Sequence, residues 1–308
     1  MNLKYGVFVN TRKYMKNPKV SIVLPCYNGA KMIGKAIESV IAQTYKDWEL
    51  IIVNDCSTDN TLEVAQSYAE KDQRIRVFSN EKNSKLPATL NHGFREAKGE
   101  LWTWTSDDNL LLPTMLEEFV NYFDTHPDVG FVVADEEYID MQGNVLGTHT
   151  IPDDVELRLP LNCFIGAAFM YKAEIAQKIG EYRVDLFLAE DFEYFLRLND
   201  NCQLAHLPKV LYQYRANPGS LTATKQKEIA ECLCRFRIDY LSKAEEHLKD
   251  YPKYIALYYY RIVDNLSGIE KWKYYLQFAK KLPYLFGIRY IFIHVPHRWF
   301  KIQKGDFV

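Results

Sequence analysis

Residues 102–109 read WTWTSDDN, a β-prone run that ends abruptly in two adjacent carboxylates. In an open α/β sheet, the side chains that follow a strand lie at the carboxyl edge, where such folds bind ligands. Two carboxylates held this close repel each other unless a cation or a proton lies between them, and their hard oxygens suit Mg²⁺ or Mn²⁺. The residues alone also allow a simpler interpretation, in which Asp107, Asp108 and Asn109 cap the following helix.

Strand and helix patterns alternate on both sides of this stretch. The predicted strands are short apolar runs at 20–24, 50–53, 75–78, 101–105, 130–134 and 210–215. After each of the first three runs, apolar residues recur at helical spacing. Because strands that alternate with helices usually form a parallel sheet, we expect an α/β fold with a doubly wound, mostly parallel sheet. From about residue 222 the pattern is helical. We therefore expect an N-terminal extension at 1–19, a sheet-containing domain at 20–222 and a helical C-terminal region at 223–308.

Composition narrows the function classes. A net charge of −2 over 308 residues gives no basic field that would favour nucleic acid. The six cysteines lack the Cys-x-x-Cys spacing of a zinc site and the density of a disulfide scaffold, which predicts reduced thiols and a cytoplasmic protein. The sequence shows neither a signal-peptide pattern nor an apolar run of membrane-spanning length.

The segment 271–308 differs from the rest in composition. It carries eight lysines and arginines against one aspartate, interleaved with aromatic residues. Such a mixture suits the headgroup layer of an anionic membrane, which would make the protein peripheral on the inner face of the membrane. The alternative is an aromatic helical appendage that packs on the preceding domain and keeps its lysines in water.

Five motifs are spread over residues 18–220, and they are VSIVLPCYN at 20–28, QT at 43–44, VNDCSTDNT at 53–61, LPATLN at 86–91 and TSDDN at 105–109. In this order they resemble the family 2 glycosyltransferases of the GT-A fold. The resemblance implies that the domain at 20–222 is catalytic. It implies a metal-dependent, inverting enzyme that moves a sugar from a nucleotide donor, with UDP-sugar expected, to a hydroxyl of a glycan or lipid-linked glycan in polysaccharide synthesis.

The resemblance also implies where the donor binds. Pro25, Tyr27 and Asn28 would hold the nucleotide base and ribose, and Asp55 would accept a hydrogen bond from the imide N–H of uracil. The alternative for Asp55, and still more for Asp59, is a cap on the next helix.

The metal and diphosphate contacts are expected further along the chain. By resemblance Asp108 binds the Mn²⁺ or Mg²⁺ ion, Asp107 contacts the ribose or the metal, and Arg215 pairs with phosphate. The sequence departs from the commonest family pattern at Thr105, where an aspartate is usual, and at Asn217, where histidine is frequent. The second departure leaves open whether the loop around Asn217 closes on the metal.

An inverting transfer needs a base for the acceptor hydroxyl, and Asp191 matches the family's catalytic base. Its neighbours Glu190 and Glu193 are either auxiliary or stabilise the start of a helix through its dipole. Trp104 stacks on sugar or lies in the core. Lys85 stands where glycine is common in the family and is either a phosphate contact or a solvated loop charge.

Two other functions compete with this one. A nucleotide-sugar-binding scaffold without catalysis would have no need of Asp191 beside an intact Asp107-Asp108 pair. A nucleotidyltransferase would want a glycine-rich, basic loop after the first strand, which residues 26–30 lack. The sugar, the acceptor and the linkage are not determined by the sequence, which also leaves a homodimer open.

Overall fold

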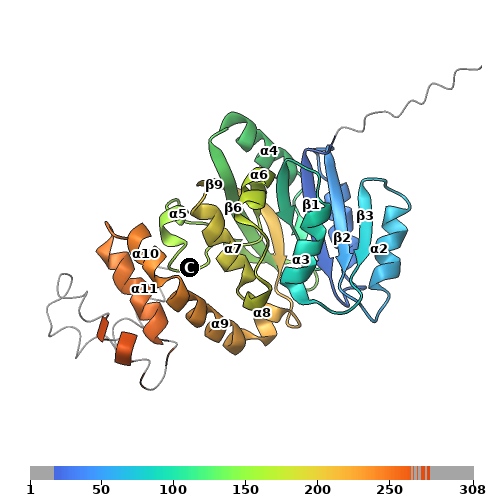
Figure 1. Ribbon diagram of the computed structural model, residues 1–308. Coiled ribbons are helices and arrows are strands. Elements are labelled where there is room, and N and C mark those ends of the chain that lie inside the picture. The colour runs from blue at the N-terminus through green and yellow to red at the C-terminus, as the bar shows by residue number, and fades with distance from the viewer. Residues whose placement is uncertain (1–16, 265, 267–268, 270–271, 275, 278–308) are drawn as a thin grey trace, which may run out of the picture.

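The computed structural model describes residues 17–264 together with 266, 269, 272–274, 276 and 277. A single twisted sheet carries helices on both faces, and further helices gather beside its later strands (Figure 1). The strands are β1 (Val20–Cys26), β2 (Trp48–Asn54), β3 (Ile75–Ser79), β4 (Leu101–Trp104), β5 (Leu110–Leu111), β6 (Val129–Ile139), β7 (Val145–His149), β8 (Phe169–Lys172) and β9 (Gln203–Arg215).

The described helices fall into two groups, those that flank the sheet and those that follow it. The first group is α1 (Ile33–Ile41), α2 (Thr61–Ala69), α3 (Lys85–Glu96), α4 (Met115–Thr125), α5 (Val155–Arg158), α6 (Ala173–Ile179), the 3₁₀ helix η1 (Val184–Leu186) and α7 (Glu190–Asn199). The second group is α8 (Leu221–Thr224), α9 (Gln226–Asp239), α10 (Leu241–His247) and α11 (Pro252–Asp264).

The strand order is β3-β2-β1-β4-β8-β6-β9-β5, and β7 pairs with β6. The strands from β3 to β4 are parallel, as predicted. Beyond them β8 runs antiparallel to both β4 and β6, and β5 runs antiparallel to β9. The predicted α/β sheet is therefore confirmed, but it is mixed rather than mostly parallel. The difference arises because β5, β7 and β8 each run antiparallel to their neighbours.

The sheet is buried from both sides. Every residue of β1 and of β2 is buried, which explains why these strands are nearly continuous apolar runs rather than alternating ones. Helices α1, α2 and α4 cover one face, and helices α3, α6 and α7 cover the other. Helix α3 lies close to the sheet at Gly93, because a Cβ there would stand 2.4 Å from Cγ1 of Val23.

The C-terminal helices share the core of the sheet domain. The ring of Phe236 in α9 contacts Phe192 of α7 with centroids 5.7 Å apart, and the Tyr240 hydroxyl donates to Asp200 at 2.9 Å. The predicted boundary near residue 222 falls at α8, yet buried side chains from α7 and α9 belong to one hydrophobic cluster. Most of the segment 271–308 lies outside the described residues. Among those that are described, no helix is both long and apolar enough to cross a membrane.

The start of α3 contains a strained residue. Lys85 has φ of 70°, a left-handed conformation that an L-residue other than glycine rarely adopts, and its side chain is exposed.

We expect Lys85→Gly to raise the free energy of unfolding by about 1 kcal/mol, because glycine adopts this φ without the steric cost of a Cβ. Lys35→Gly is the matched control, since Lys35 is exposed in the interior of α1. The control should lose about 1 kcal/mol. Urea unfolding of both variants measures the difference. Equal destabilisation of the two would contradict the strain at Lys85.

Candidate active site

The loop after β1 is held by the loop after β2. The backbone N–H of Asn28 donates to the Ser57 hydroxyl at 3.0 Å, and Oδ1 of Asn28 accepts from the N–H of Thr58 at 2.8 Å. Asp59 accepts from the N–H of Ala30 at 3.2 Å and from the N–H of Thr61 at the start of α2. Asp59 therefore binds the first N–H of α2 and also fixes the loop in which Tyr27 is half exposed.

Asp107 lies against this loop. A Cβ at Gly29 would stand 1.9 Å from Oδ2 of Asp107, so only glycine leaves room for the carboxylate. Burial and the neighbouring charge of Asp108 raise the pKa of Asp107 to about 7, although backbone N–H groups, including that of Tyr27, act in the opposite direction. The structure thus brings Tyr27, Asn28 and Asp107 together at the carboxyl edge of the sheet.

Asp108 is fixed by the end of β9 and the segment after it. Its Oδ2 accepts from the amide of Asn217 at 2.9 Å, and its Oδ1 accepts from the Ser106 hydroxyl at 3.0 Å. The loop that follows β9 therefore reaches the predicted metal ligand. Here an amide occupies the position where the family frequently has histidine.

Arg215 is buried and supports the same turn. Its Nε donates to the backbone carbonyl of Asp108 at 2.8 Å and its Nη1 to that of Asp140 at 2.7 Å, while its own N–H donates to Oδ1 of Asn109. The predicted phosphate contact of Arg215 stays a prediction. In this structure its guanidinium orients the backbone next to Asp108.

The donor set fits a divalent cation. Asp107 and Asp108 offer adjacent carboxylate oxygens, and their mutual repulsion contributes to the raised pKa of Asp107. The described residues contain no group of three or more His, Cys, Asp or Glu that would hold a metal by itself. An Mg²⁺ or Mn²⁺ ion at this pair would take its other ligands from phosphate and water, as is usual where a nucleotide is the substrate.

Asp55 lies at the end of β2 and faces the start of α3. Its Oδ1 accepts from the N–H of Ser84 and from the amide of Asn80, both at 2.7 Å, and its Oδ2 accepts from the N–H of Lys85 at 2.9 Å. Asp55 thus caps α3, not the helix next to it in sequence. One lone pair of Oδ2 is left for the predicted contact with a nucleotide base.

Three carboxylates gather at the start of α7, and they differ in their surroundings. Glu193 forms a bidentate ion pair with Arg197 at 2.8 and 2.9 Å, so it has a structural role. Burial, with the charge of Asp191 nearby, raises the pKa of Glu190 to about 8, and its Oε2 accepts from the N–H of Leu188 at 2.6 Å. Burial also raises the pKa of Asp191, while the N–H of Phe192, 2.7 Å from its Oδ1, lowers it.

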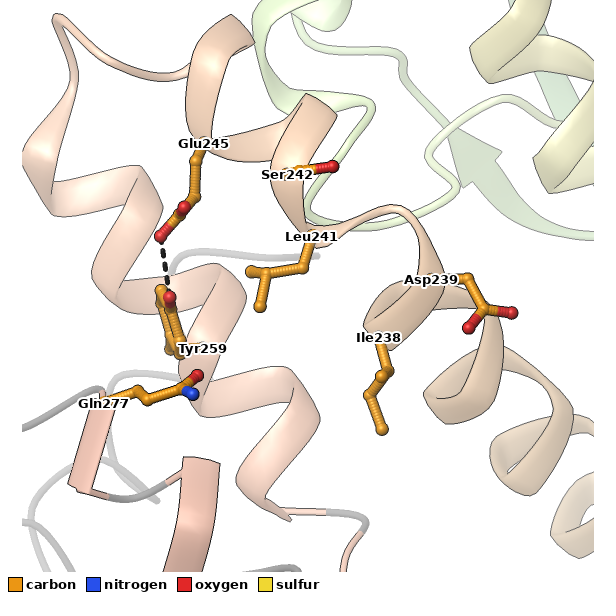
Figure 2. Close-up of a pocket in the computed structure, with 7 residues that line it drawn as sticks. All are labelled: Ile238, Asp239, Leu241, Ser242, Glu245, Tyr259 and Gln277. Atoms are coloured by element: carbon orange, nitrogen blue, oxygen red, sulfur yellow. Dashed lines mark hydrogen bonds between the residues drawn. The ribbon is translucent and has the colours of Figure 1, made fainter.

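Tyr214 in β9 is influenced by carboxylates from both parts of the site, the turn at Asp108 and the start of α7. Burial raises the pKa of its phenol, a hydrogen bond with Thr222 lowers it, and the charges of Asp108, Glu136 and Asp191 raise it further. Asp108 and Asp191, which are 83 positions apart in sequence, therefore both lie within electrostatic reach of one tyrosine. A pocket of about 500 Å³ among the C-terminal helices has none of the motif residues in its lining (Figure 2).

Some residues at the site carried no clear signal in the sequence. Glu136 continues the apolar strand β6 into the site, where it is 2% exposed and burial raises its pKa. Tyr212 is buried and hydrogen-bonds to Thr105 at 2.7 Å. Thr105 therefore has a packing role where the family usually has an aspartate. Trp104 is half-buried against Phe169, with ring centroids 5.9 Å apart.

The family profile described as "Glycosyl transferase family 2" matches residues 21–180. Asp191, Arg215 and Asn217 lie beyond the matched range. The "Uncharacterized glycosyltransferase RT0329" of Rickettsia typhi is 31% identical over 225 residues, which are 70% of this chain and 69% of the relative. The protein y4gI of Sinorhizobium fredii is 33% identical over 221 residues, and there the matched region is only 24% of the relative's length.

Solved structures show the same architecture. Staphylococcus aureus TarS 1–349 in complex with UDP-GlcNAc superposes with a TM-score of 0.63 at 17% identity, over 86% of this chain and 82% of that one. The mannosyltransferase PcManGT of Pyrobaculum calidifontis, in complex with GDP-Man and Mn²⁺, gives a TM-score of 0.59 at 17% identity, over 88% and 82%. These likenesses confirm the GT-A fold with a helical C-terminal region. The chain belongs to glycosyl transferase family 2 and is a glycosyltransferase.

Proposed function

We propose that this glycosyltransferase is metal-dependent and inverting, and that it moves a sugar from a UDP-sugar to a hydroxyl of a glycan or lipid-linked glycan. The observation that carries the proposal is the pair of adjacent carboxylates Asp107 and Asp108, which Gly29 and Asn217 hold at the carboxyl edge of the sheet. The proposed base, Asp191, lies in the first turn of α7.

The donor would lie along the loops after β1, β2 and β4. Tyr27 offers a half-exposed ring for the base, and Asp55 keeps an acceptor position for an imide N–H. This arrangement, and the UDP-GlcNAc complex of TarS, support a uridine nucleotide as the donor. A bound divalent cation at Asp107 and Asp108 would neutralise the charge that develops on the departing diphosphate.

Asp191 would take the proton of the acceptor hydroxyl as that oxygen attacks the sugar from the face opposite the nucleotide. A raised carboxyl pKa makes it a better proton acceptor near neutral pH. Burial, together with the charge of Asp191, also raises the pKa of the neighbouring Glu190. If the donor is the usual α-linked sugar nucleotide, the product is β-linked. Peripheral membrane location and a homodimer remain predictions.

The first test is thermal unfolding with UDP, GDP and CDP, each with and without Mn²⁺. A ligand present at one hundred times its Kd adds about 2.7 kcal/mol to stability, so a specific nucleotide raises the melting temperature measurably. We expect UDP with Mn²⁺ to give the largest shift. A larger shift with GDP would change the proposed donor. Absence of any shift would contradict the metal and diphosphate roles of Asp107 and Asp108.

We expect Gly29→Ala to weaken binding of UDP with Mn²⁺ by about tenfold or more, equivalent to about 1.4 kcal/mol, because the new methyl group displaces the Asp107 carboxylate. Gly147→Ala is the matched control, since a Cβ at Gly147 has no neighbouring atom within 4 Å. Isothermal titration calorimetry on the two variants measures the difference. Unchanged affinity in Gly29→Ala would remove Asp107 from the nucleotide site.

We expect Asp191→Asn to lower sugar transfer by roughly 10²- to 10⁴-fold with UDP binding unchanged, because a carboxamide accepts no proton. Asp185→Asn is the control, since it breaks only the exposed ion pair with Arg183.

In the unmodified protein, transfer should fall as the pH decreases through the raised pKa of Asp191. This acidic limb should lie above the ordinary carboxyl value of 3.8. UDP release from a panel of UDP-sugars measures each rate, and retained activity in Asp191→Asn would refute the base assignment.

A further inference from the structure

The segment between α6 and α7 leads directly to Asp191 and has little regular structure of its own. Gly180 and Leu188 have φ of 86° and 84°, and the only helical piece between them is the three-residue η1. A segment of this kind has few internal backbone hydrogen bonds to fix its path. The position of Asp191 therefore depends on side chains that reach the segment from neighbouring elements.

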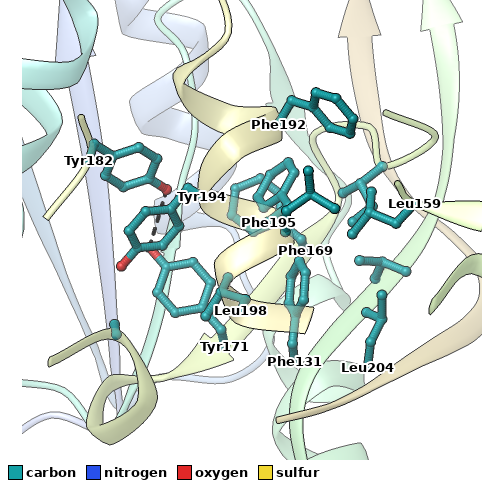
Figure 3. Close-up of a cluster of buried hydrophobic side chains, with 14 of the residues drawn as sticks. Phe131, Leu159, Phe169, Tyr171, Tyr182, Phe192, Tyr194, Phe195, Leu198 and Leu204 are labelled. Carbon is teal, nitrogen blue, oxygen red and sulfur yellow. Dashed lines mark hydrogen bonds between the residues drawn. The ribbon is translucent and has the colours of Figure 1, made fainter. Parts of the chain in front are cut away.

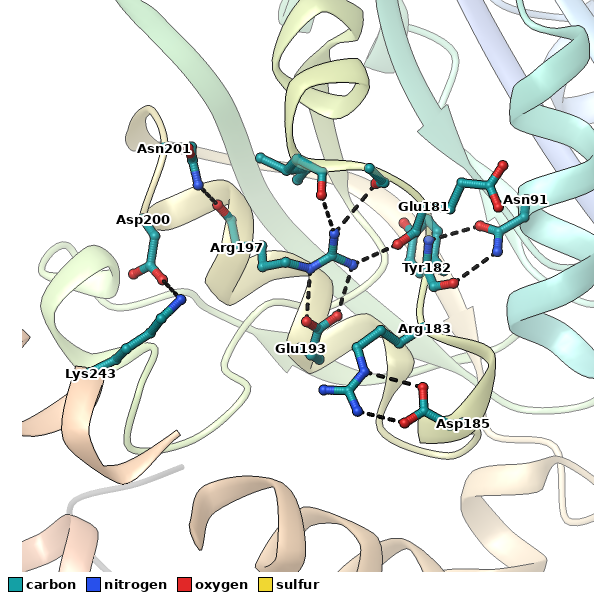
Figure 4. Close-up of polar contacts among 12 residues, drawn as sticks. Asn91, Glu181, Tyr182, Arg183, Asp185, Glu193, Arg197, Asp200, Asn201 and Lys243 are labelled. Atoms are coloured by element: carbon teal, nitrogen blue, oxygen red, sulfur yellow. Dashed lines mark hydrogen bonds and ion pairs between the residues drawn. The ribbon is translucent and has the colours of Figure 1, made fainter. Parts of the chain in front are cut away.

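Asn91 of α3 makes the most complete of these contacts. Its Nδ2 donates to the carbonyl of Tyr182 at 2.8 Å, and its Oδ1 accepts from the N–H of Tyr182 at 2.8 Å (Figure 4). The side chain is buried, so both bonds form away from competing water. One carboxamide thus satisfies both backbone groups of Tyr182, which fixes the two peptide planes on either side of its Cα.

The ring of Tyr182 adds a second link between the same elements. It stacks on Phe94 of α3 with centroids 6.0 Å apart and on Tyr194 of α7 with centroids 3.8 Å apart. Figure 3 shows Tyr182 next to Tyr194 within the buried cluster around α7. Tyr182 is therefore attached to α3 through its backbone and its ring, and to the helix that begins beside Asp191 through its ring.

Arg197 holds the beginning of the segment from the α7 side. Besides its ion pair with Glu193, its guanidinium donates to the carbonyl of Ile179 at 2.7 Å and to that of Glu181 at 2.8 Å (Figure 4). Arg197 and Asn91 thus both bind the peptide between Glu181 and Tyr182, Arg197 at its carbonyl and Asn91 at its N–H.

The start of α3 is the part of the helix that Asp55 caps. Asn91 lies six residues after Lys85, which is about 9 Å along the helix axis. Helix α3 packs closely on β1 at Gly93, and it connects the cap at Asp55 with the contact at Tyr182.

We propose that Asn91 is a positioning residue for Asp191: through Tyr182 it fixes the segment that precedes α7, and α3 thereby holds the catalytic base in register with the nucleotide loop at Asp55. This proposal rests on the proposed function, because it assumes that Asp191 is the base. It differs from a general stabilising role, which would affect nucleotide binding and transfer alike.

Hydrogen–deuterium exchange of the full chain tests the structural half without any substrate. We expect Asn91→Ala to raise exchange in residues 180–192 while residues 48–80 keep the wild-type rate. Asn201→Ala is the matched control, because Asn201 donates to a backbone carbonyl at the far end of α7. If Asn91→Ala folds poorly, Asn91→Ser keeps one hydrogen-bonding group and should give an intermediate effect. Unchanged exchange in 180–192, or a uniform rise along the chain, would overturn the proposal.

Kinetics test the functional half. We expect Asn91→Ala to lower kcat by roughly tenfold to a hundredfold, with UDP binding in the presence of Mn²⁺ unchanged, because small displacements of a reacting group cost this much. In the Asp191→Asn background the same change should cost nothing further, since the group that it positions is absent. An equal loss in both backgrounds would overturn the proposal. Wild-type activity in Asp191→Asn would instead refute the base assignment itself, and this proposal with it.

Discussion

Two adjacent carboxylates held at the end of β4 are the constraint on which this site depends. Asp107 and Asp108 are both partly buried, and burial together with the charge of Asp108 raises the pKa of Asp107. The neighbouring parts of the chain are organised to keep the pair in place. Gly29 leaves room for one carboxylate, and Asn217 with Arg215 orients the other.

The first half of the fold could be predicted because its signals are local. Buried parallel strands are apolar runs, and the helices between them carry apolar residues at helical spacing, so periodicity alone locates β1 to β4. The second half is less regular. Strand β6 extends to Ile139, beyond the apolar run that ends at Ala134, because Asp135 and Glu136 are buried through contacts with distant residues. No local pattern indicates such contacts.

The same distinction separates the parts of the site. Asp107, Asp108 and Asp191 can be predicted as site residues because they stand at the end of a strand or at the start of a helix and because the motifs resemble a family. The contact of Asn91 gives no local signal, since its partner Tyr182 is 91 positions away. The resemblance predicts a phosphate contact for Arg215, and in the structure its guanidinium donates to two backbone carbonyls. Pairings over such distances are set by the tertiary fold.

The shared core of α7 and α9 has a consequence for how relatives of this enzyme diverge. Phe236 contacts the helix that contains Asp191, and Tyr240 bonds to the residue at its end, so a change in the C-terminal helices affects the packing of the catalytic half. A recombination event that exchanged the chain after residue 222 would leave Phe192 facing a foreign surface. Substitutions on the two helices should therefore be correlated across lineages, and exchange of modules should be tolerated mainly when both helices move together.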